Sequence, residues 1–464
     1  MIYLSIKIYF HILCYLSITI FNTTYNSQPQ REKEILSDHE KHELARIFVE
    51  DNVNEFNQIL KESHDYNHFN GHILVVHRGR IIYDNFIGYA DFTTKDTLST
   101  ESVYQLASIS KQFTAMAIMI LKERGILDYD DRMVQFIPEL SDEKIQYYDS
   151  ITIRHLLNHT AGLPNYMYFV EKYINKNEYP YNDEVIRLLA DHKMNLNFKP
   201  GSRFSYSNTG YMLLALIVER VSQQPFADFV KDNIFIPLDM HNSFVYSKTR
   251  NKDDYENRLI GFKKYRKFHP IPETQHDGVV GDKGVYSTAS DLYKWDRALY
   301  TDILVSIKTL EEAFTPGKLN NGRYIPYGFG FRIKQVENNR RMVYHNGLWN
   351  GFRTSFFRYV DDNSTIIIMD HSDCKAKHII AKKIERILLS HHLNYTRLLA
   401  EKAIEEGPES AIDIYYSMNR MKIDIIVNIE ELKKIYQYLN DINKKQIASR
   451  IDELLQAISG QMES

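Results

Sequence analysis

The stretch that decides the fold is Leu106-Ala107-Ser108-Ile109-Ser110-Lys111-Gln112-Phe113-Thr114-Ala115. It opens a run from Ile109 to Leu121 that is apolar almost all round and ends before the helix-stopping Gly125. A helix without a polar face belongs in the interior of a protein. The stretch therefore predicts a buried central helix with a serine and a lysine at its start.

Ser108 and Lys111 lie three residues apart, which places both side chains on one face of a helix. The helix N-terminus supplies positive potential and free backbone N–H groups beside the serine hydroxyl. Serine is a poor nucleophile without an adjacent base, and a desolvated lysine can lose its proton near neutrality and become that base. The alternative is a capping serine followed by an exposed lysine, but an apolar helix does not suit a solvated lysine in its first turn.

A second motif, Tyr206-Ser207-Asn208, follows a turn-rich segment and leads into another apolar helix, Tyr211 to Val221. A phenol near a lysine can exchange a proton with a serine and then with a leaving group. The asparagine amide can bind a substrate carbonyl and also contact the lysine. Taken alone, the motif also fits a packed tyrosine beside a turn-forming asparagine.

A third motif, His345-Asn346-Gly347, continues through Leu348 to Gly351. Glycines at the start of a strand permit close approach of the backbone to a ligand. The histidine could hydrogen-bond the tyrosine or a substrate carboxylate, and the alternative is a histidine at the edge of the core. In isolation this motif is ambiguous.

In this order the three motifs resemble the Ser-x-x-Lys set of β-lactamases and penicillin-binding proteins. The chain resembles the serine hydrolases of the class C β-lactamase type, which include D-alanyl-D-alanine carboxypeptidases and esterases. Four segments also look like those of the family: residues 106–115, 151–164, 281–288 and 327–330. The resemblance covers about residues 40 to 392.

The resemblance implies that Ser108 is the acylated nucleophile and that Lys111 accepts its proton. Tyr206 would be the second proton carrier, and Asn208 would bind the substrate amide. With no convincing glutamate-bearing loop of the class A kind, deacylation would rely on Tyr206 and Lys111.

His345 stands where many family members have the lysine of Lys-Thr-Gly, so it and Gly347 would bind substrate. A histidine of ordinary pKa is mostly neutral near pH 7, unlike lysine, which puts β-lactamase activity in doubt. The oxyanion hole would consist of the backbone N–H groups of Ser108 and Leu348.

The fold implied by the resemblance is a mixed α/β (α+β) fold of the β-lactamase and penicillin-binding transpeptidase type. An antiparallel sheet is flanked by helices and joined by an all-helical subdomain, with the site between them. Hydrophobic periodicity predicts the following elements: a helix from Leu44 to Ile59, a hairpin over residues 73–83, strands at 354–357 and 365–369, and a helix from Ile379 to Leu389.

The domain boundaries follow from composition. Residues 1–27 predict a signal peptide or anchor, because Lys7 precedes a short apolar run that ends near Phe21. Residues 28–39 read as a polar lead-in, 40–392 as the hydrolase domain and 395–464 as a helical extension, with Gly407-Pro408 between two of its helices. The protein is therefore expected to be exported, periplasmic or secreted, with membrane contact only if residues 1–21 are retained.

Neither a metal nor an organic cofactor is expected. His155 and His159 are spaced by four residues, but Leu156 stands where a His-Glu-x-x-His zinc motif needs glutamate, so a helix end beside the site is favoured. The run Asp370-His371-Ser372 cannot form a triad from neighbours in sequence alone. The charge-rich segment Arg250 to Lys267 is expected to be a solvated loop, although the family resemblance implies that loops there can line the substrate cleft. Lys283 is expected to be a turn lysine, the alternative being a cation in that cleft.

Overall composition excludes several classes of protein. The chain has 464 residues, of which 44% are hydrophobic and 25% charged, as in globular proteins rather than disordered or multi-span membrane proteins. With 57 basic and 60 acidic residues the net charge is −3, so nucleic acid is not an expected partner. The two cysteines, Cys14 and Cys374, exclude a disulfide framework.

The predicted function is hydrolysis of an amide or ester in a small-molecule or peptide substrate through an acyl-enzyme. Within this class, a D-alanyl-D-alanine carboxypeptidase or other peptidase, a β-lactamase and an esterase remain open. The alternative of another class is a non-catalytic β-lactam- or peptide-binding sensor on the same fold. The C-terminal helices are a candidate surface for contact with a partner.

Overall fold

The computed structural model describes residues 36–37, 40, 44, 50–141, 147–192, 195–250, 255–336, 340–389, 395–420 and 427–462. The predicted export segment, residues 1–27, lies outside them. The chain divides into two compact units, residues 48–393 and residues 1–47 with 394–464. Among the described residues, no helix is long and apolar enough to cross a membrane.

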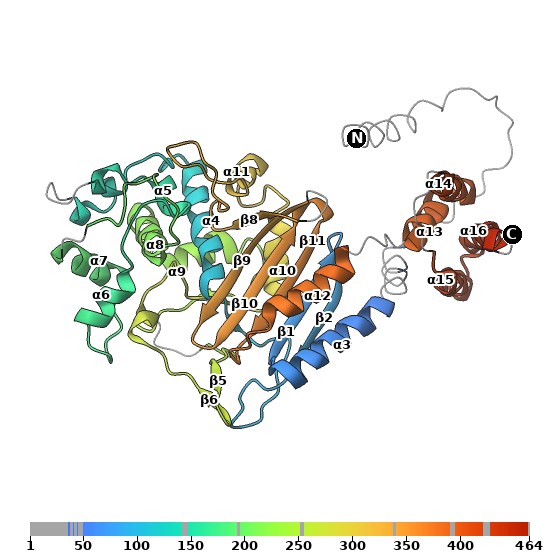
Figure 1. The fold of residues 1–464 in the computed structure, drawn as a ribbon, viewed down its shortest axis with the longest axis horizontal. Helices are drawn as coiled ribbons and strands as arrows, with labels where there is room; N and C mark the ends of the chain where they lie inside the picture. The colour runs from blue at the N-terminus through green and yellow to red at the C-terminus, as the bar shows by residue number, and fades with distance from the viewer. Residues whose placement is uncertain are drawn as a thin grey trace. The chain divides into compact units, whose positions relative to one another are not determined.

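The larger unit is built on a six-stranded antiparallel sheet in the order β2-β1-β11-β10-β9-β8 (Figure 1). Its strands are β1 (Gly71–His77), β2 (Arg80–Ile87), β8 (Arg332–Gln335), β9 (Arg341–Trp349), β10 (Phe352–Tyr359) and β11 (Ser364–Asp370). The predicted hairpin and both predicted strands are confirmed. The hairpin turns at Arg78-Gly79, where both residues have positive φ.

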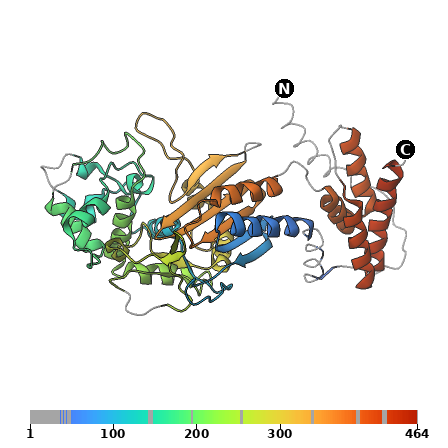
Figure 2. The ribbon, with the colours of Figure 1, turned by 60° about the horizontal axis from the view of Figure 1, so that its bottom comes forward.

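The centre of the sheet is buried on both faces. Alternate residues of β11 point to opposite sides, so Ile366 and Ile368 join one apolar cluster while Ile367 and Met369 join the other. Helices α3 (Glu50–Asn67) and α12 (Lys377–Leu389) lie side by side over the first face (Figure 2). α10 (Ala289–Ala298) contacts the sheet at β1 and β11, on the side of the larger cluster.

The larger cluster surrounds two apolar helices, α4 (Ser110–Glu123) and α8 (Asn208–Ser222), which pack on each other. The prediction of buried helices is confirmed, since Phe113 through Leu121 are all buried. The remaining helices of this unit are α5 (Ile153–Leu157), α6 (Tyr166–Tyr173), α7 (Asn182–Asp191), α9 (Phe226–Val230) and α11 (Ile307–Ala313).

Two small sheets complete the unit: β3 (Tyr104–Gln105), β7 (Val285–Ser287) and β4 (Phe244–Val245) form one, and β5 (Phe262–Lys264) with β6 (Phe268–Pro270) form the other. Strand β5 lies within the segment predicted to be a solvated loop, residues 250–267, and β6 follows directly after it. That prediction is wrong for Leu259 and Phe262, which are buried, because apolar side chains among the charges anchor the segment.

The described part of the smaller unit includes the helices α13 (Tyr395–Glu406), α14 (Pro408–Arg420), α15 (Ile429–Asp441) and α16 (Lys445–Met462). As predicted, Gly407 with positive φ ends one helix and Pro408 opens the next. Buried residues recur at helical spacing, for example Leu432, Ile435 and Leu439 on α15. The helix predicted from Leu44 to Ile59 corresponds, from Glu50 onward, to α3 of the larger unit.

Candidate active site

The nucleophile candidate stands on a strained turn. Ser108 lies in a single 3-10 turn, η1 (Ala107–Ile109), directly before α4, so the helix begins two residues after the serine. Ala107 has a φ of +50°, a left-handed conformation that costs a non-glycine residue roughly 1–2 kcal/mol. Ser108 remains half-exposed while its neighbours Ala107 and Ile109 are fully buried. The turn thus presents the hydroxyl to a ligand at the head of a rigid helix.

Lys111 is completely buried beside that hydroxyl. Its Nζ donates to Asn208 Oδ1 at 2.9 Å and to the Asp282 carbonyl oxygen at 2.7 Å, and it lies 3.3 Å from Ser108 Oγ. Burial lowers the pKa of Lys111 to about 7; the Asp282 carboxylate opposes the shift and the Arg332 guanidinium adds to it. A neutral amine is therefore substantially populated near neutral pH.

The three partners orient that neutral amine. A neutral lysine carries two N–H bonds and one lone pair, and carbonyl oxygens can only accept. The two hydrogens consequently go to Asn208 Oδ1 and the Asp282 carbonyl, and the lone pair is left facing Ser108 Oγ. This is the geometry of a general base on a serine nucleophile.

Tyr206 lies against the same amine, with its ring centroid 5.0 Å from Lys111 Nζ. Burial raises the pKa of Tyr206, and the nearby Ser108 hydroxyl and Arg332 guanidinium offset the rise only in part. Its buried hydroxyl has no hydrogen-bond partner within bonding geometry among the described residues. The phenol is therefore neutral and free to pass a proton.

Asn208 is the first residue of α8, whose N-cap Ser207 accepts from the Gly210 N–H at 3.3 Å. Its Oδ1 accepts from Lys111, whereas the hydrogen-bond partner of its Nδ2 among the described residues is the Met167 sulfur at 3.9 Å. A thioether is a weak acceptor, so this amide N–H is available to a substrate carbonyl.

His345 is tied to the protein through both ring nitrogens. Nδ1 lies 2.9 Å from the Asn346 carbonyl oxygen, so it carries the hydrogen, and Nε2 accepts from the Tyr327 hydroxyl at 3.0 Å. The pKa of His345 is well below the ordinary value because the ring is buried beside the cations Lys111 and Arg332. The sequence placed this histidine on the catalytic tyrosine or a substrate carboxylate; the structure places it on Tyr327.

Gly347 is required by close packing. A Cβ there would lie 2.2 Å from the Leu106 carbonyl oxygen and 2.1 Å from Thr354 Oγ1. Strand β9 therefore reaches the turn that carries Ser108, and Thr354 Oγ1 donates to the same Leu106 carbonyl at 2.8 Å.

The next peptide unit, Gly347–Leu348, presents its N–H away from β10. The β9–β10 hairpin closes through Asn350-Gly351, both with positive φ, so Trp349 and Phe352 form a hydrogen-bonded pair. Pairs alternate along an antiparallel ladder, so Leu348, opposite Arg353, directs its N–H away from β10. This orientation fits the predicted oxyanion donor.

Three further residues lie at the site without having been assigned a catalytic or substrate-binding role from the sequence. His159, assigned there to a helix end, lies with its ring centroid 4.4 Å from that of Tyr206, and its Nδ1 accepts from the Ser207 N–H at 3.1 Å. It holds the loop that carries the phenol.

Arg332, at the start of β8, is half-buried, with Cζ 5.2 Å from the Tyr206 ring centroid. No carboxylate among the described residues pairs with it. It follows the family-like segment 327–330 by two residues, but nothing in that pattern indicates a role for the arginine.

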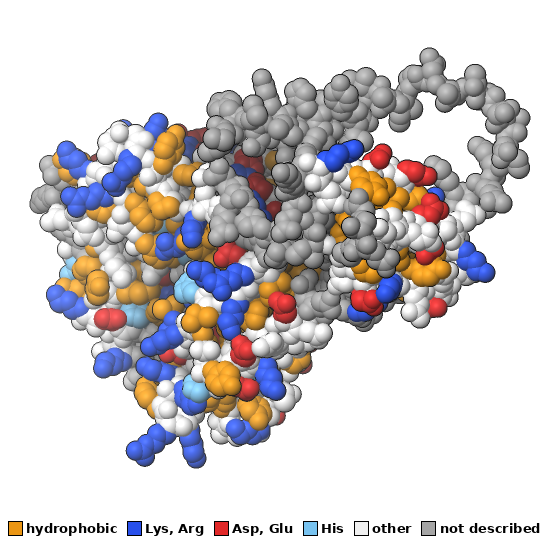
Figure 3. Space-filling model, turned by 45° about the vertical axis from the view of Figure 1, so that its right-hand side comes forward, with side chains coloured by type: hydrophobic (Ala, Val, Ile, Leu, Met, Phe, Trp, Pro, Cys, Tyr) orange, Lys and Arg blue, Asp and Glu red, His pale blue; other side chains and the backbone are white. Residues whose placement is uncertain are grey.

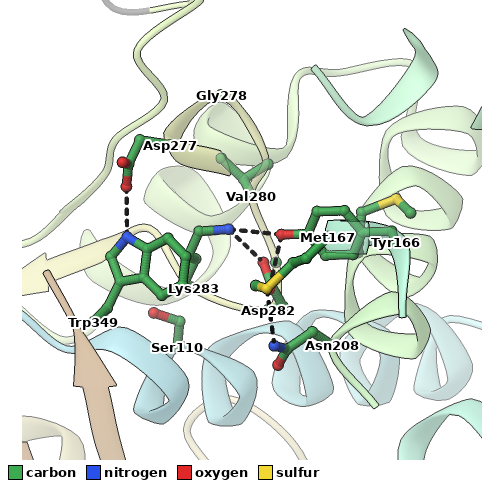
Figure 4. Close-up of polar contacts among 12 residues, drawn as sticks. Ser110, Tyr166, Met167, Asn208, Asp277, Gly278, Val280, Asp282, Lys283 and Trp349 are labelled. Atoms are coloured by element: carbon green, nitrogen blue, oxygen red, sulfur yellow. Dashed lines mark hydrogen bonds and ion pairs between the residues drawn. The ribbon is translucent and has the colours of Figure 1, made fainter. Parts of the chain in front are cut away.

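Lys283 lies in a bend, as a turn lysine would, but its side chain is buried, and Figure 4 shows it pointing toward Tyr166 and Asp282. Its Nζ donates to the Tyr166 hydroxyl at 2.7 Å, pairs with Asp282 at 3.4 Å and lies 4.9 Å from the Trp349 ring centroid. The Tyr166 hydroxyl also donates to Asp282 at 3.1 Å, and the Trp349 indole N–H donates to Asp277 at 2.6 Å. This network holds the Asp282 backbone that binds Lys111.

The described residues contain no group of three or more His, Cys, Asp or Glu side chains placed to hold a metal. His155 Nδ1 accepts from the Thr152 N–H at 3.1 Å as part of a helix cap, whereas His159 faces the tyrosines. Asp370 accepts from Ser372 and from backbone N–H groups, and His371 bonds the Ile260 carbonyl, so the two do not form a relay. Basic, acidic and apolar side chains are interspersed on the described surface in Figure 3.

Known proteins resemble this chain in both sequence and fold. The Beta-lactamase family model matches residues 55–377. Penicillin-binding protein 4* of Bacillus subtilis (strain 168) is 36% identical over 357 residues, covering 74% of this chain and 77% of the relative.

Among solved structures, the octameric penicillin-binding protein homologue from Pyrococcus abyssi aligns with a TM-score of 0.62 and 25% identity over 75% of this chain and 81% of its own. A D-stereospecific amidohydrolase from Streptomyces sp. aligns with a TM-score of 0.58 and 19% identity over 72% of this chain and 97% of its own, a likeness of fold alone.

Proposed function

The chain belongs to the Beta-lactamase family, and from this premise we propose that it is a hydrolase that forms an acyl-enzyme on Ser108 and cleaves small amide or peptide substrates bearing a carboxylate. The observation that carries the proposal is the oriented Lys111 amine, 3.3 Å from Ser108 Oγ and held by two carbonyl oxygens.

Acylation begins when Ser108 Oγ attacks the substrate carbonyl carbon and its proton moves to the neutral Lys111 amine. The carbonyl oxygen becomes an oxyanion that the N–H groups of Ser108 and Leu348 stabilise. Lys111 then returns the proton through the neutral Tyr206 phenol to the leaving nitrogen, and the carbon–nitrogen bond breaks.

Deacylation uses the same groups in reverse. A water molecule attacks the acyl carbon while Tyr206 and Lys111 take its proton, and the oxygen of Ser108 leaves and regains a proton. Asn208 donates to the substrate carbonyl on the acyl side and keeps the Lys111 amine in place. Because these proton carriers are assembled around one serine, turnover is favoured over the non-catalytic sensor.

The preference for a carboxylate rests on Arg332. A guanidinium binds carboxylates strongly and keeps its charge at all physiological pH values, and Arg332 is half-buried beside Tyr206 without an ion-pair partner among the described residues. His345 is neutral, and both of its ring nitrogens are hydrogen-bonded to the protein. Arg332 therefore supplies the positive charge that a lysine at position 345 would carry. A peptide ending in a carboxylate suits the site better than a neutral ester.

Labelling and hydrolysis assays test the proposal. A fluorophosphonate followed by peptide mass spectrometry is expected to modify Ser108, and a D-alanyl-D-alanine peptide is expected to be hydrolysed with a higher kcat/KM than a p-nitrophenyl ester or nitrocefin. Ser108→Ala serves as the control. The proposal is wrong if no adduct forms on Ser108, or if Ser108→Ala hydrolyses these substrates as well as the parent.

The apolar segment of residues 1–21 further supports the proposal that the protein is exported, which fractionation of the expressing cell would test. The helices of residues 395–462 are proposed to contact a partner rather than the reacting atoms. A chain ending at residue 393, at the border of the two compact units, is expected to retain fluorophosphonate labelling. Loss of labelling in a truncated chain that remains folded would contradict this assignment.

A further inference from the structure

Lys377, the first residue of α12, is a buried cation with an unusual set of partners. Its side chain is only slightly exposed, and Nζ donates to the Gly347 carbonyl oxygen at 3.0 Å and to the Thr354 carbonyl oxygen at 3.2 Å. No carboxylate among the described residues pairs with it within ion-pair distance. Burying an ammonium without a counter-ion is costly, so this placement requires an explanation.

Hydrogen bonding within the sheet does not supply that explanation. Gly347 and Thr354 face each other two positions from the hairpin's closing pair, Trp349 with Phe352, and therefore form a hydrogen-bonded pair themselves. In such a pair the Gly347 carbonyl accepts from the Thr354 N–H, and the Thr354 carbonyl accepts from the Gly347 N–H. Lys377 adds a second, charged donor to carbonyls that would be satisfied without it.

The Gly347 carbonyl belongs to the same peptide unit as the Leu348 N–H. A charged donor on the oxygen of an amide draws electron density from its nitrogen, so the N–H becomes a stronger donor. It also fixes the plane of the peptide, because the carbonyl and N–H point in opposite directions across a trans bond. The Leu348 N–H points away from β10, and the adjoining Gly347 packs on the Leu106 carbonyl of the turn that carries Ser108.

We propose that Lys377 is a positioning residue that polarises and orients the Gly347–Leu348 peptide, so that the Leu348 N–H stabilises the oxyanion formed on the substrate. The inference rests on the proposed acyl-enzyme at Ser108. Lys377 would act through this peptide and not on the substrate directly, because its buried Nζ is held by the Gly347 and Thr354 carbonyl oxygens.

The charge state of Lys377 makes the device sensitive to pH. Burial and the neighbouring Arg353 lower the pKa of Lys377 to about 8, and the Asp370 carboxylate opposes the shift. The charge of Lys377 also contributes to the lowered pKa of His345 on β9 and of His378 on α12, and for both histidines burial is the larger cause. Lys377 is therefore charged below about pH 8 and loses its charge, and its effect on the peptide, as the pH rises through that value.

Two variants and one control separate polarisation from a simple structural clamp. Lys377→Met removes the charge, whereas Lys377→Arg keeps a cation that does not titrate. Lys383→Met is the matched control, since Lys383 lies on the same helix and its Nζ pairs with Glu62 at 2.8 Å on the surface. The substrate is a p-nitrophenyl ester, whose leaving group needs no proton, and each variant is checked for folding by circular dichroism.

For Lys377→Met we expect kcat to fall about tenfold with KM within about twofold, since an oxyanion donor acts mainly in the transition state. In the parent, kcat should decline above about pH 8, and Lys377→Arg should abolish that decline. Should Lys377→Met fail to fold, Lys377→Arg and the parent profile decide the question.

An unchanged kcat in folded Lys377→Met, a loss confined to KM, or an alkaline decline that persists in Lys377→Arg would overturn the inference. Labelling of Ser108 in the parent keeps this result separate from the proposed function. If the parent is labelled and the Lys377 variants behave as the control, only the inference fails; if the parent is not labelled, the acyl-enzyme fails and the inference falls with it.

Discussion

The α4–α8 side of the site and the β8–β9 side treat their basic groups in opposite ways. On the first side, both N–H bonds of neutral Lys111 are held by carbonyl oxygens, so its lone pair faces Ser108. On the second, His345 spends one nitrogen on the Asn346 carbonyl and the other on Tyr327. The difference teaches that a motif predicts where a basic side chain lies, while its partners decide whether it is available to a substrate.

The largest effect is expected on the α4–α8 side, where the Lys111 amine faces Ser108. Lys111→Met removes the base from Ser108, and kcat for a D-alanyl-D-alanine peptide should fall by at least about 10³-fold. Lys122→Met, on the same helix but half-exposed over the Tyr129 ring, should stay within about twofold of the parent. Steady-state kinetics of both variants check this, and a Lys111→Met enzyme within tenfold of the parent would remove the basis of the comparison.

The second effect tests whether Arg332 supplies the charge that His345 does not. Arg332→Met should lower kcat/KM for a peptide with a free carboxylate by about 10²-fold, the usual scale for losing a charged hydrogen bond. The same peptide with an amidated end should lose less than about threefold. The assays belong at about pH 8.5, above the pKa of about 7 that Lys111 has in the parent, because loss of the Arg332 cation raises that pKa. Equal losses for the two peptides would show that Arg332 does not read the carboxylate.

The third effect concerns how kcat/KM depends on pH through Lys111 on the α4–α8 side. Lys111 acts as a base only when neutral, so kcat/KM should rise with pH through about 7, its pKa in the folded protein. The Asp282 carboxylate raises that pKa, so Asp282→Asn should move the rise to lower pH by about one unit. A pH profile of kcat/KM measures the shift, with thermal unfolding as the check on folding. A rise that moves to higher pH would contradict the proposed electrostatics.

The smallest effect on activity is expected at His345. His345→Gln removes a ring that is neutral and turned toward the protein, so kcat/KM should change by less than about fivefold. The free energy of unfolding should drop by about 1–3 kcal/mol, because the buried Tyr327 hydroxyl loses its acceptor. Chemical denaturation and the hydrolysis assay check the two parts. A loss of activity comparable to that of Lys111→Met would place His345 in the proton transfer after all.

The sequence was sufficient for much of the fold and for the centre of the site. The apolar runs behind Ser108 and Asn208 predicted two buried helices, and those helices bring Lys111 and Asn208 within 2.9 Å although 97 positions separate them. Periodicity also predicted the hairpin and the strands at the centre of the sheet. These features are local, so the pattern that encodes them is contiguous in the chain.

The remainder could not be predicted because it depends on partners brought together by tertiary packing. The family-like segments 281–288 and 327–330 contain or adjoin Lys283 and Arg332, but they do not show what these charges contact. Lys377 reaches the Gly347 carbonyl from the first turn of α12, a helix that packs on β10. No sequence pattern shows which ring nitrogen of His345 faces a carbonyl. The apolar anchors of the β5–β6 segment were likewise hidden among its charges.

The central claim is that neutral Lys111, and not His345, activates Ser108. The rate of fluorophosphonate labelling of Ser108, followed from about pH 5 to about pH 9 in the parent and in His345→Gln, tests it most directly. The account predicts that the rate rises through about pH 7 in both proteins, at the pKa of Lys111. A rise that disappears in His345→Gln, or a rate that does not change with pH in the parent, would contradict it.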